Sequence, residues 1–190
     1  MNIGLYFGTF NPIHLGHLAI ANYIVEYTDI RELWFVVSPH NPFKQETSLL
    51  RDWHRLEMVS LAIGKDMRFR ACDVEFRLSK PSYTIDTLAW LHDRYPSHNF
   101  SIVMGSDNLQ SLHKWKNADI IMRDYRIIIY PRPGYPIEDT AKFNNITVTD
   151  APLMEISATF IRKAVAAGKD VRYFMPPQVW NYIEKMNFFR

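Results

Sequence analysis

Four short and largely apolar segments, each followed by a polar or helical stretch, constrain this chain more than any other feature. They are residues 3–7, 33–38, 100–104 and 126–130. A strand that is apolar along its whole length is buried on both faces, which is typical of a parallel sheet with helices on each side. The pattern predicts an α/β protein with a Rossmann-like, doubly wound parallel sheet.

Further segments complete the alternation of strands and helices. Two weaker strands are predicted at residues 67–74 and 146–148. Helices are predicted at 18–25, 50–63, 84–94, 118–123 and 156–168, with a last helix opened by Pro176 and Pro177. Thr84 is expected to cap its helix. The order predicts a single domain over residues 1–190, with the C-terminal helices (about 157–190) packed on the sheet.

The composition excludes several classes of protein. The 190 residues are 47% hydrophobic and carry a net charge of +2, so a folded core is expected and a general attraction to nucleic acid is not. One cysteine, Cys72, excludes an internal disulfide. No apolar run approaches the roughly 20 residues of a membrane span, and the start lacks the pattern of a signal peptide. We expect a cytoplasmic protein without nucleic-acid or membrane partners, and the sequence leaves a homo-oligomer open.

The turn at residues 8–17 joins the first predicted strand to the first helix. A glycine-started turn in this place holds phosphates in many α/β proteins, because backbone N–H groups and the helix dipole point at one spot. His14 and His17 flank Gly16 within it. Asn11 followed by Pro12 has the form of a helix cap and the first helical residue. The turn predicts a site for the phosphates of a nucleotide.

Other polar groups follow the ends of predicted strands. They are the loop at residues 39–45 with Lys44, the group Gly105 to Asp107, and Arg132. Ligands of open parallel sheets bind outside the carboxyl ends of the strands. We therefore expect these residues to meet at one edge of the sheet. Arg132 lies between two prolines, so an ordinary turn arginine is the alternative interpretation.

Two motifs make the chain recognisable. Residues 8–17, Gly-Thr-Phe-Asn-Pro-Ile-His-Leu-Gly-His, resemble the HxGH signature of the nucleotidylyltransferase superfamily, and residues 156–162, Ile-Ser-Ala-Thr-Phe-Ile-Arg, resemble its ISxTxxR signature. The segments 39–44, 81–88, 105–107 with Trp115, and 132–135 narrow the resemblance to the bacterial nicotinate mononucleotide adenylyltransferases. The resemblance implies a nucleotidylyltransferase-type sheet and the transfer of AMP from ATP to nicotinate mononucleotide, giving deamido-NAD and pyrophosphate.

The resemblance also implies the roles of individual residues. Catalytic roles fall to His14, His17, Lys44 and Arg162. Contacts to ATP fall to Gly8, Thr9, Phe10, Gly105, Asp107, Arg132, Ile156, Ser157 and Thr159. Contacts to nicotinate mononucleotide fall to Tyr83, Thr84, Trp115 and Lys116. Besides the turn arginine given above for Arg132, ordinary structural roles are the alternatives for four of these residues: a solvated loop lysine for Lys44, a helix cap for Ser157, an exposed arginine for Arg162, and a core tryptophan for Trp115.

The chemistry of adenylyl transfer fits this set of residues. A phosphate monoester has its second pKa near ~6, so the attacking oxygen is already mostly ionised at neutral pH and needs no general base. The barrier lies in bringing two anions together, which donors such as His, Lys, Arg and backbone N–H groups lower. We expect direct in-line attack on the α-phosphate, without a covalent enzyme intermediate. Mg²⁺ is expected with ATP and without a protein cage of its own.

Three rival interpretations remain at this point. A phosphopantetheine adenylyltransferase or a cytidylyltransferase would share both signatures, although the segment 81–88 and Trp115 speak against them. A nucleotide-binding sensor without catalysis is a second rival, and it would not need His14, His17, Lys44 and Arg162 together. A dehydrogenase is disfavoured because no G-x-G-x-x-G follows the first predicted strand.

Overall fold

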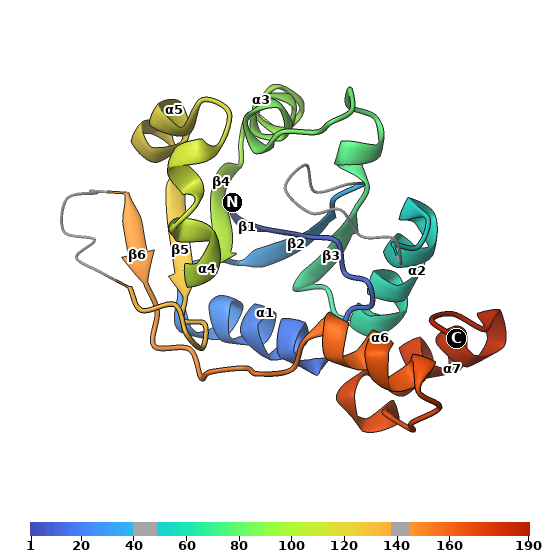
Figure 1. Ribbon diagram of the computed structural model, residues 1–190. Helices are drawn as coiled ribbons and strands as arrows, with labels where there is room; N and C mark the ends of the chain where they lie inside the picture. Colours follow the sequence, from blue (N-terminus) through green and yellow to red (C-terminus); the bar gives the residue numbers. More distant parts are fainter. Residues whose placement is uncertain (40–48, 138–144) are drawn as a thin grey trace.

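Six parallel strands form one central sheet in the computed structural model, which describes residues 1–39, 49–137 and 145–190 (Figure 1). The strands are β1 (Asn2–Gly8), β2 (Glu32–Val37), β3 (Phe69–Cys72), β4 (Asn99–Gly105), β5 (Arg126–Tyr130) and β6 (Ile146–Val148). Their order across the sheet is β3-β2-β1-β4-β5-β6, and every pair runs parallel. The predicted doubly wound parallel sheet is confirmed.

Alternate side chains of the strands enter two separate cores. In β2, Phe35 joins the core on one face of the sheet, whereas Trp34 and Val36 join the core on the other. In β5, Ile128 takes the first face and Ile127 the second. Successive residues of a strand point to opposite faces, so burial on both faces requires the continuous apolar runs that the sequence contains.

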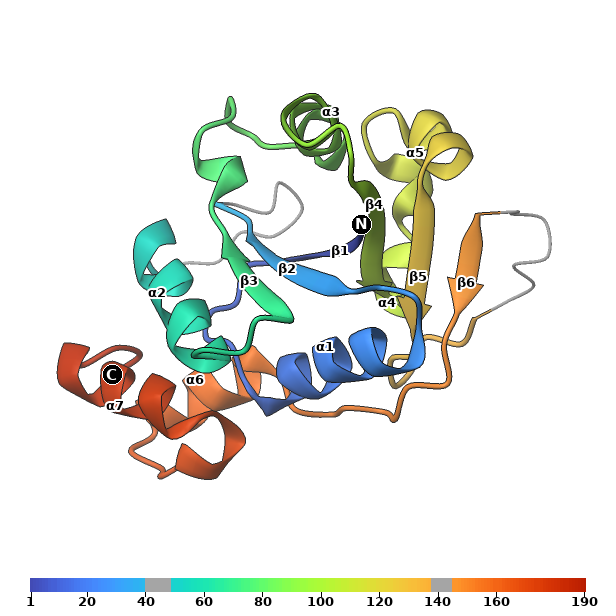
Figure 2. The same ribbon diagram turned by 180° about the vertical axis from the view of Figure 1, so that it is seen from behind.

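Helices cover both faces of the sheet. The first face carries α1 (Leu15–Tyr27), α2 (Asp52–Ile63), α6 (Ala158–Ala166) and α7 (Pro177–Met186), and the second carries α3 (Thr84–Arg94), α4 (Ser106–Leu109) and α5 (Ala118–Asp124). Figures 1 and 2 show α3 and α5 on one side of the sheet and α1, α6 and α7 on the other. Ile161 of α6 and Ile183 of α7 are fully buried in the same core as α1.

The order of the strands reverses between β1 and β4. From β1 the chain continues outward through β2 and β3, and it returns to the other side of β1 for β4, β5 and β6. A crevice opens at such a point because the connections from the two neighbouring strands leave on opposite faces. The turn after β1 and the residues after β4 therefore face each other.

Most predicted elements are present, with shifts at their ends. The predicted strand 67–74 is shorter, since β3 ends at Cys72 and a 3₁₀ turn covers Val74–Phe76. Helix α6 ends at Ala166, followed by Gly168 with φ of 69°, a conformation that glycine adopts without strain. Trp34 and Phe35 are buried in the cores, whereas Trp90 and Trp180 are only partly buried against them.

None of the helices in the described ranges combines the length and the apolar character that a membrane span requires.

Candidate active site

The turn between β1 and α1 folds the ring of Phe10 back over Gly8. Phe10 has a φ of 45°, which residues other than glycine rarely adopt. A Cβ atom on Gly8 would lie 2.9 Å from the Phe10 ring, so only glycine leaves room for it. Backbone held in such a conformation is common where a turn has a function.

Asn11 does not cap helix α1, so that prediction is wrong. The helix begins at Leu15, and His14 stands at the N-cap position. Asn11 is fully buried; its Oδ1 accepts a hydrogen bond from the Leu50 N–H group at 3.3 Å. The left-handed backbone of Phe10 redirects the chain, and the helix therefore starts three residues later than Pro12.

His14 and His17 stack on each other at the start of α1. Their ring centroids lie 3.7 Å apart, at an interplanar angle of 28°. The His14 N–H group donates to Nδ1 of His17 at 3.3 Å. Because Nδ1 accepts, a neutral His17 carries its proton on Nε2, where it can donate to a phosphate oxygen. A Cβ on Gly16 would lie 3.1 Å from the His14 ring, so this glycine makes room for the stack.

Both histidines are uncharged at neutral pH. Burial, followed by the positive charge of Arg132, lowers the pKa of His14 to about 3. Burial also lowers the pKa of His17 well below its usual value, with His14 and Arg132 adding to the shift. Nδ1 of His14 is buried without a hydrogen-bond partner among the described residues. A polar atom in that state costs about 1–3 kcal/mol, so a ligand or water that reached it would be favoured.

Two tyrosines lie beneath the histidines and were not predicted. The hydroxyl groups of Tyr6 on β1 and Tyr130 on β5 are 3.0 Å apart and buried. The Tyr6 ring packs in T-shaped contacts with Phe10 and His17, with ring centroids 5.7 Å and 6.0 Å apart. Burial raises the pKa of both hydroxyls, so they stay protonated. Sequence patterns identify both tyrosines only as strand residues. The contact between their hydroxyl groups depends on the order of the strands in the sheet, which those patterns do not give.

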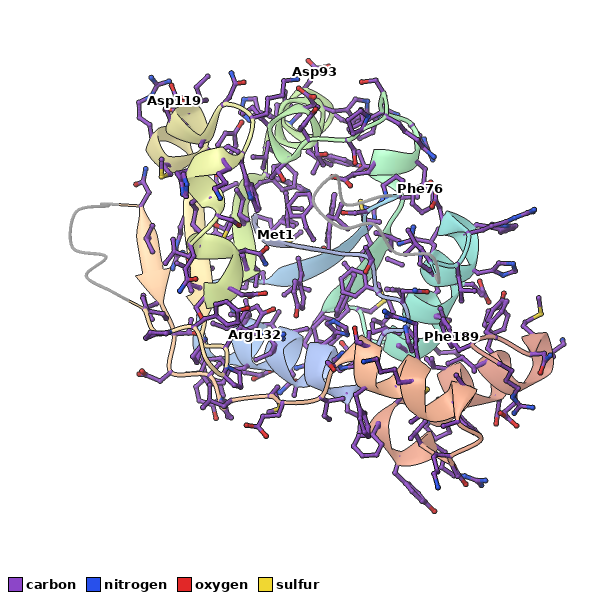
Figure 3. All side chains as sticks on the ribbon, in the orientation of Figure 1. Met1, Phe76, Asp93, Asp119, Arg132 and Phe189 are labelled. Carbon is purple, nitrogen blue, oxygen red and sulfur yellow. The ribbon has the colours of Figure 1, made fainter. Side chains whose placement is uncertain are left out.

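The ends of β4 and β5 bring Asp107 and Arg132 together. The Arg132 N–H group donates to Oγ of Ser106 at 3.0 Å, and Arg132 Nε lies 3.8 Å from Oδ1 of Asp107. A Cβ on Gly105 would lie 2.4 Å from that oxygen, so glycine is needed where the two side chains meet. Figure 3 labels Arg132 just beyond β5, on the side of the sheet that carries α1.

The second motif packs directly against the first. Ser157 caps α6, because its Oγ accepts from the Phe160 N–H group at 3.2 Å. Arg162 Nη1 donates to the carbonyl of Asn11 at 2.8 Å, across 151 residues of sequence. Ile156 lies 3.6 Å from the Cβ position of Gly16. The α6 N-terminus, with its unpaired N–H groups, therefore stands beside the turn that carries the histidines.

Arg55 of α2 holds this region together, and sequence patterns did not single it out. The residue is fully buried. Its guanidinium donates to four carbonyl oxygens and one carboxylate: Thr9 at 2.6 Å, Ser38 at 2.7 Å, Leu50 at 2.9 Å, Pro39 at 3.0 Å and Asp52 at 2.8 Å. One side chain thus fixes the ends of β1 and β2 relative to α2. In the sequence, Arg55 is an arginine within a polar predicted helix, and nothing in the pattern around it predicts that it is buried.

Three of the predicted acceptor residues, Tyr83, Thr84 and Lys116, meet at the start of α3. Lys116 lies 4.8 Å above the ring of Tyr83, and its Nζ pairs with Asp86 at 2.9 Å. Trp115 is partly buried against the second core. Thr84 is the first residue of α3, and Tyr83 is the N-cap, so the prediction that Thr84 caps this helix is wrong. The backbone is already helical at Thr84, which excludes the extended conformation of a cap.

Glu75 anchors the acceptor segment and was also missed. Its buried carboxylate accepts from Thr87 Oγ1 at 2.9 Å and from Ser82 Oγ at 3.0 Å. Burial raises the pKa of Glu75, while its hydrogen bonds with Ser38, Thr87 and Ser82 oppose the shift. A buried carboxylate on a 3₁₀ turn leaves no signature in sequence, because its partners lie 7 and 12 residues away.

Lys44 lies outside the described residues, so its predicted position over the triphosphate stays a prediction. Within the described ranges, no group of three or more His, Cys, Asp and Glu side chains is placed to hold a metal ion. The donors near the turn are instead imidazoles, guanidiniums and N–H groups, which suit phosphate oxygens.

Comparison with known proteins agrees with the two motifs. The model of the cytidylyltransferase-like family matches residues 5–164. A probable nicotinate-nucleotide adenylyltransferase of Flavobacterium johnsoniae is 47% identical over 192 residues, covering 100% of both chains. A second, from Porphyromonas gingivalis, is 49% identical over 177 residues, covering 93% of this chain and 90% of its own. This chain belongs to the nicotinate-nucleotide adenylyltransferase family.

Solved structures show the same fold. The Plasmodium falciparum nicotinic acid mononucleotide adenylyltransferase complexed with NaAD superimposes with a TM-score of 0.84 at 23% identity, covering 99% of this chain and 97% of that one. A putative nicotinate-nucleotide adenylyltransferase from Vibrio parahaemolyticus gives a TM-score of 0.73 at 21% identity, covering 100% and 95%. The predicted family and nucleotidylyltransferase-type fold are confirmed, and with them the class of enzyme.

Proposed function

We propose that this chain transfers the adenylyl group of ATP to nicotinate mononucleotide, giving deamido-NAD and pyrophosphate. The observation that carries the proposal is the junction of the two motifs, where Arg162 of α6 donates to the carbonyl of Asn11 in the β1–α1 turn. That junction puts the histidine pair and the α6 N-terminus on one side of the crevice at β1 and β4. The full-length similarity to proteins named nicotinate-nucleotide adenylyltransferase supports the choice of acceptor.

In the proposed reaction an oxygen of the acceptor's phosphate forms a bond to the α-phosphorus of ATP. The bond from that phosphorus to the bridging oxygen breaks, and the electron pair leaves with pyrophosphate. His17, with its proton on Nε2, donates to an α-phosphate oxygen as charge builds up there. One preorganised donor of this kind lowers the barrier by about 3–4 kcal/mol.

The cationic groups share the charge of the triphosphate. Arg132 lies close enough to lower the pKa of both histidines, so it acts on the same region of space. Arg162 and the N–H groups at the start of α6 take the β- and γ-phosphates, with Ser157 and Thr159, and Lys44 joins them in the proposal. Mg²⁺ enters as part of the MgATP substrate, held by phosphate oxygens and water.

The acceptor occupies the start of α3 in this proposal. Trp115 stacks on the pyridine ring, and the backbone around Thr84 receives the nicotinate carboxylate, as N–H groups at a helix start can. Tyr83 and Lys116 lie in contact beside it. Asp107 accepts from a ribose hydroxyl of ATP. We place the reaction in the cytoplasm, because both substrates are polyanions that do not cross a bilayer unaided.

A pyrophosphate-release assay with a panel of acceptors and nucleotides tests the proposal. We expect turnover of ATP with nicotinate mononucleotide well ahead of nicotinamide mononucleotide, and none with phosphopantetheine. CTP in place of ATP should give little product. Turnover of phosphopantetheine alone, or of CTP in preference to ATP, would contradict the proposal.

A further inference from the structure

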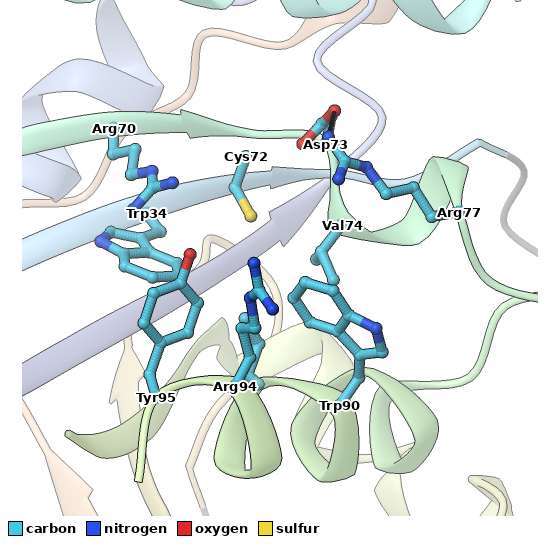
Figure 4. Close-up of a pocket in the computed structure, with 10 residues that line it drawn as sticks. Trp34, Arg70, Cys72, Asp73, Val74, Arg77, Trp90, Arg94 and Tyr95 are labelled. Carbon is cyan, nitrogen blue, oxygen red and sulfur yellow. Dashed lines mark hydrogen bonds and ion pairs between the residues drawn. The ribbon is translucent and has the colours of Figure 1, made fainter. Parts of the chain in front are cut away.

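A cavity lies on the second face of the sheet, the face that also carries the predicted acceptor residues at the start of α3. Its volume is about 330 Å³, and it is enclosed by β2, β3 and the C-terminal half of α3 (Figure 4). None of its lining residues belongs to the predicted contacts of ATP or of nicotinate mononucleotide. Cavities of roughly 300–1,000 Å³ are the usual size of small-molecule sites. We refer to it as the arginine cavity, after Arg70, Arg77 and Arg94, which line it.

Positive charge dominates the arginine cavity. The three guanidiniums come from three different segments, and Asp73 is the one carboxylate among the lining residues that the structure describes. Asp73 pairs with Arg77 at 3.1 Å. Across the part of the chain that the structure describes, neither Arg70 nor Arg94 has a carboxylate within ion-pair distance. Three arginines and one aspartate give the described lining a local charge excess of +2.

Aromatic rings form the walls of the arginine cavity. The Arg70 guanidinium lies 4.4 Å from the centre of the Trp34 ring and 6.0 Å from that of Tyr95. The Trp34 indole is itself fixed by a hydrogen bond to Glu32 at 2.7 Å. A guanidinium stacked on a ring keeps its N–H groups in the plane of the fork, where they can bind an anion bidentately. Arg70 is therefore held in place before any ligand arrives.

Arg94, Trp90 and Cys72 also belong to the described lining of the arginine cavity. Figure 4 shows Arg94 rising between Tyr95 and Trp90 toward Cys72. Trp90 is only partly buried, so part of its side-chain surface is accessible. Cys72 at the floor is a neutral thiol, since burial raises its pKa to about 11. The lining thus offers aromatic faces and guanidinium forks with little competing negative charge.

We propose that the arginine cavity binds a small ligand made of a flat aromatic ring and a phosphate group. The phosphate lies between Arg70 and Arg94, whose forks match its oxygens. The ring lies against Trp90, which provides a face for stacking. This proposal does not depend on the adenylyltransferase reaction, since the two sites share no residue.

A titration with 1-naphthyl phosphate, followed by NMR of the indole N–H groups, tests the proposal on the intact protein. The chain has five tryptophans, and single Trp→Phe variants assign their signals. We expect saturable shifts of Trp34 and Trp90, with a dissociation constant below about 1 mM. Trp53, exposed on α2, should not respond. Trp115 reports on the proposed acceptor site, so a response of Trp115 without Trp90 would overturn the proposal.

Variants and simpler probes complete the test. Arg94→Gln should weaken binding by about tenfold or more, because it removes a charge-assisted contact. Arg123→Gln, an exposed arginine on α5, is the matched control and should leave the dissociation constant unchanged. Both variants should keep the adenylyltransferase activity. Unchanged binding in Arg94→Gln would contradict the proposal, as would equal affinity for 1-naphthol or for inorganic phosphate alone.

Discussion

The two halves of the candidate active site are built in different ways. The phosphate half comprises residues 8–17, 105–107, 132 and 156–162, and contacts between distant segments hold it: Arg162 with Asn11, and Arg55 with Thr9. The acceptor half comprises residues 81–87 and 115–116. Among the described residues, Lys116 connects its two segments through a partly exposed ion pair with Asp86 and a contact with the Tyr83 ring, and Glu75 anchors it from within.

The difference in construction matches a difference in the proposed ligands of the two halves. A triphosphate presents the same charges in every reaction of this fold, so a fixed set of neutral histidines and guanidiniums can be preorganised for it. The acceptor group is what distinguishes one nucleotidyl transfer from another. Surface pairs such as Lys116 with Asp86 contribute little to stability, so contacts there can change without unfolding the site. The predictions below separate the two halves, beginning with the largest effect.

His17→Ala should lower kcat by about 10²–10³-fold, since it removes a donor to the charge of the transition state. The dissociation constant of ATP should change by less than about threefold, because His17 contributes mainly when that charge develops. Steady-state kinetics and calorimetry with an unreactive ATP analogue measure the two quantities. His113→Ala, exposed on the surface, is the control. Equal losses in kcat and in affinity would reduce His17 to a binding residue.

Arg55→Lys should lower the free energy of unfolding by about 3 kcal/mol, although the charge is kept. A lysine cannot span five acceptors, and the buried carbonyls that lose their donor cost about 1–3 kcal/mol each. Urea unfolding followed by circular dichroism measures the change. Arg172→Lys, whose guanidinium is exposed and pairs with Asp170, should be nearly neutral. A loss below about 1 kcal/mol would show that Arg55 does not brace the phosphate half.

Acid should destabilise the wild type more than the variant His14→Gln. The pKa of His14 is about 3 in the folded protein and about 6.5 when unfolded, so only the unfolded chain takes up this proton between those values. Stability therefore falls as the pH drops below about 6.5, by about 2 kcal/mol at pH 5 for this one group. The free energy of unfolding should be measured at pH 7 and at pH 5 for both proteins. Its decrease between the two pH values should be about 2 kcal/mol smaller in His14→Gln than in the wild type. Identical losses would mean that His14 is charged in the fold.

Lys116→Ala should change the free energy of unfolding by less than about 1 kcal/mol, because its partner Asp86 is exposed. If Lys116 also contacts the acceptor, the KM of nicotinate mononucleotide should rise several-fold while that of ATP stays constant. Steady-state kinetics with each substrate varied in turn separate these outcomes, and Lys114→Ala serves as the exposed neighbour for comparison. An increase confined to the KM of ATP would place Lys116 in the phosphate half.

The fold followed from sequence to a large extent, because wholly apolar strands leave few alternatives to a covered parallel sheet. The two motifs of the phosphate half were also found from sequence, because each is one continuous segment, and the roles given to their residues stay predictions. What failed was conformational detail. The cap at Asn11 is displaced by the left-handed Phe10, a conformation that tertiary packing over Gly8 imposes. The local conformational preferences of the sequence do not predict this left-handed conformation at Phe10.

The buried polar residues could not be predicted from the sequence, for a different reason. Arg55 and Glu75 are defined by partners from several segments, and such partners are known only once the chain is folded. The pair of Tyr6 and Tyr130 depends in the same way on strand order, across 124 residues. Sequence patterns therefore identify motifs of adjacent residues more readily than the buried groups that hold those motifs in place.

A double-mutant cycle of His17→Ala and Trp115→Ala tests the separation of the two halves most directly. The measured quantity is kcat/KM for nicotinate mononucleotide at saturating ATP, in the wild type, both single variants and the double variant. If the halves act independently, the two losses in transition-state stabilisation should add to within about 0.5 kcal/mol. A coupling energy above about 1 kcal/mol would show that the histidine pair and the acceptor contact form one interdependent unit, and would contradict the account.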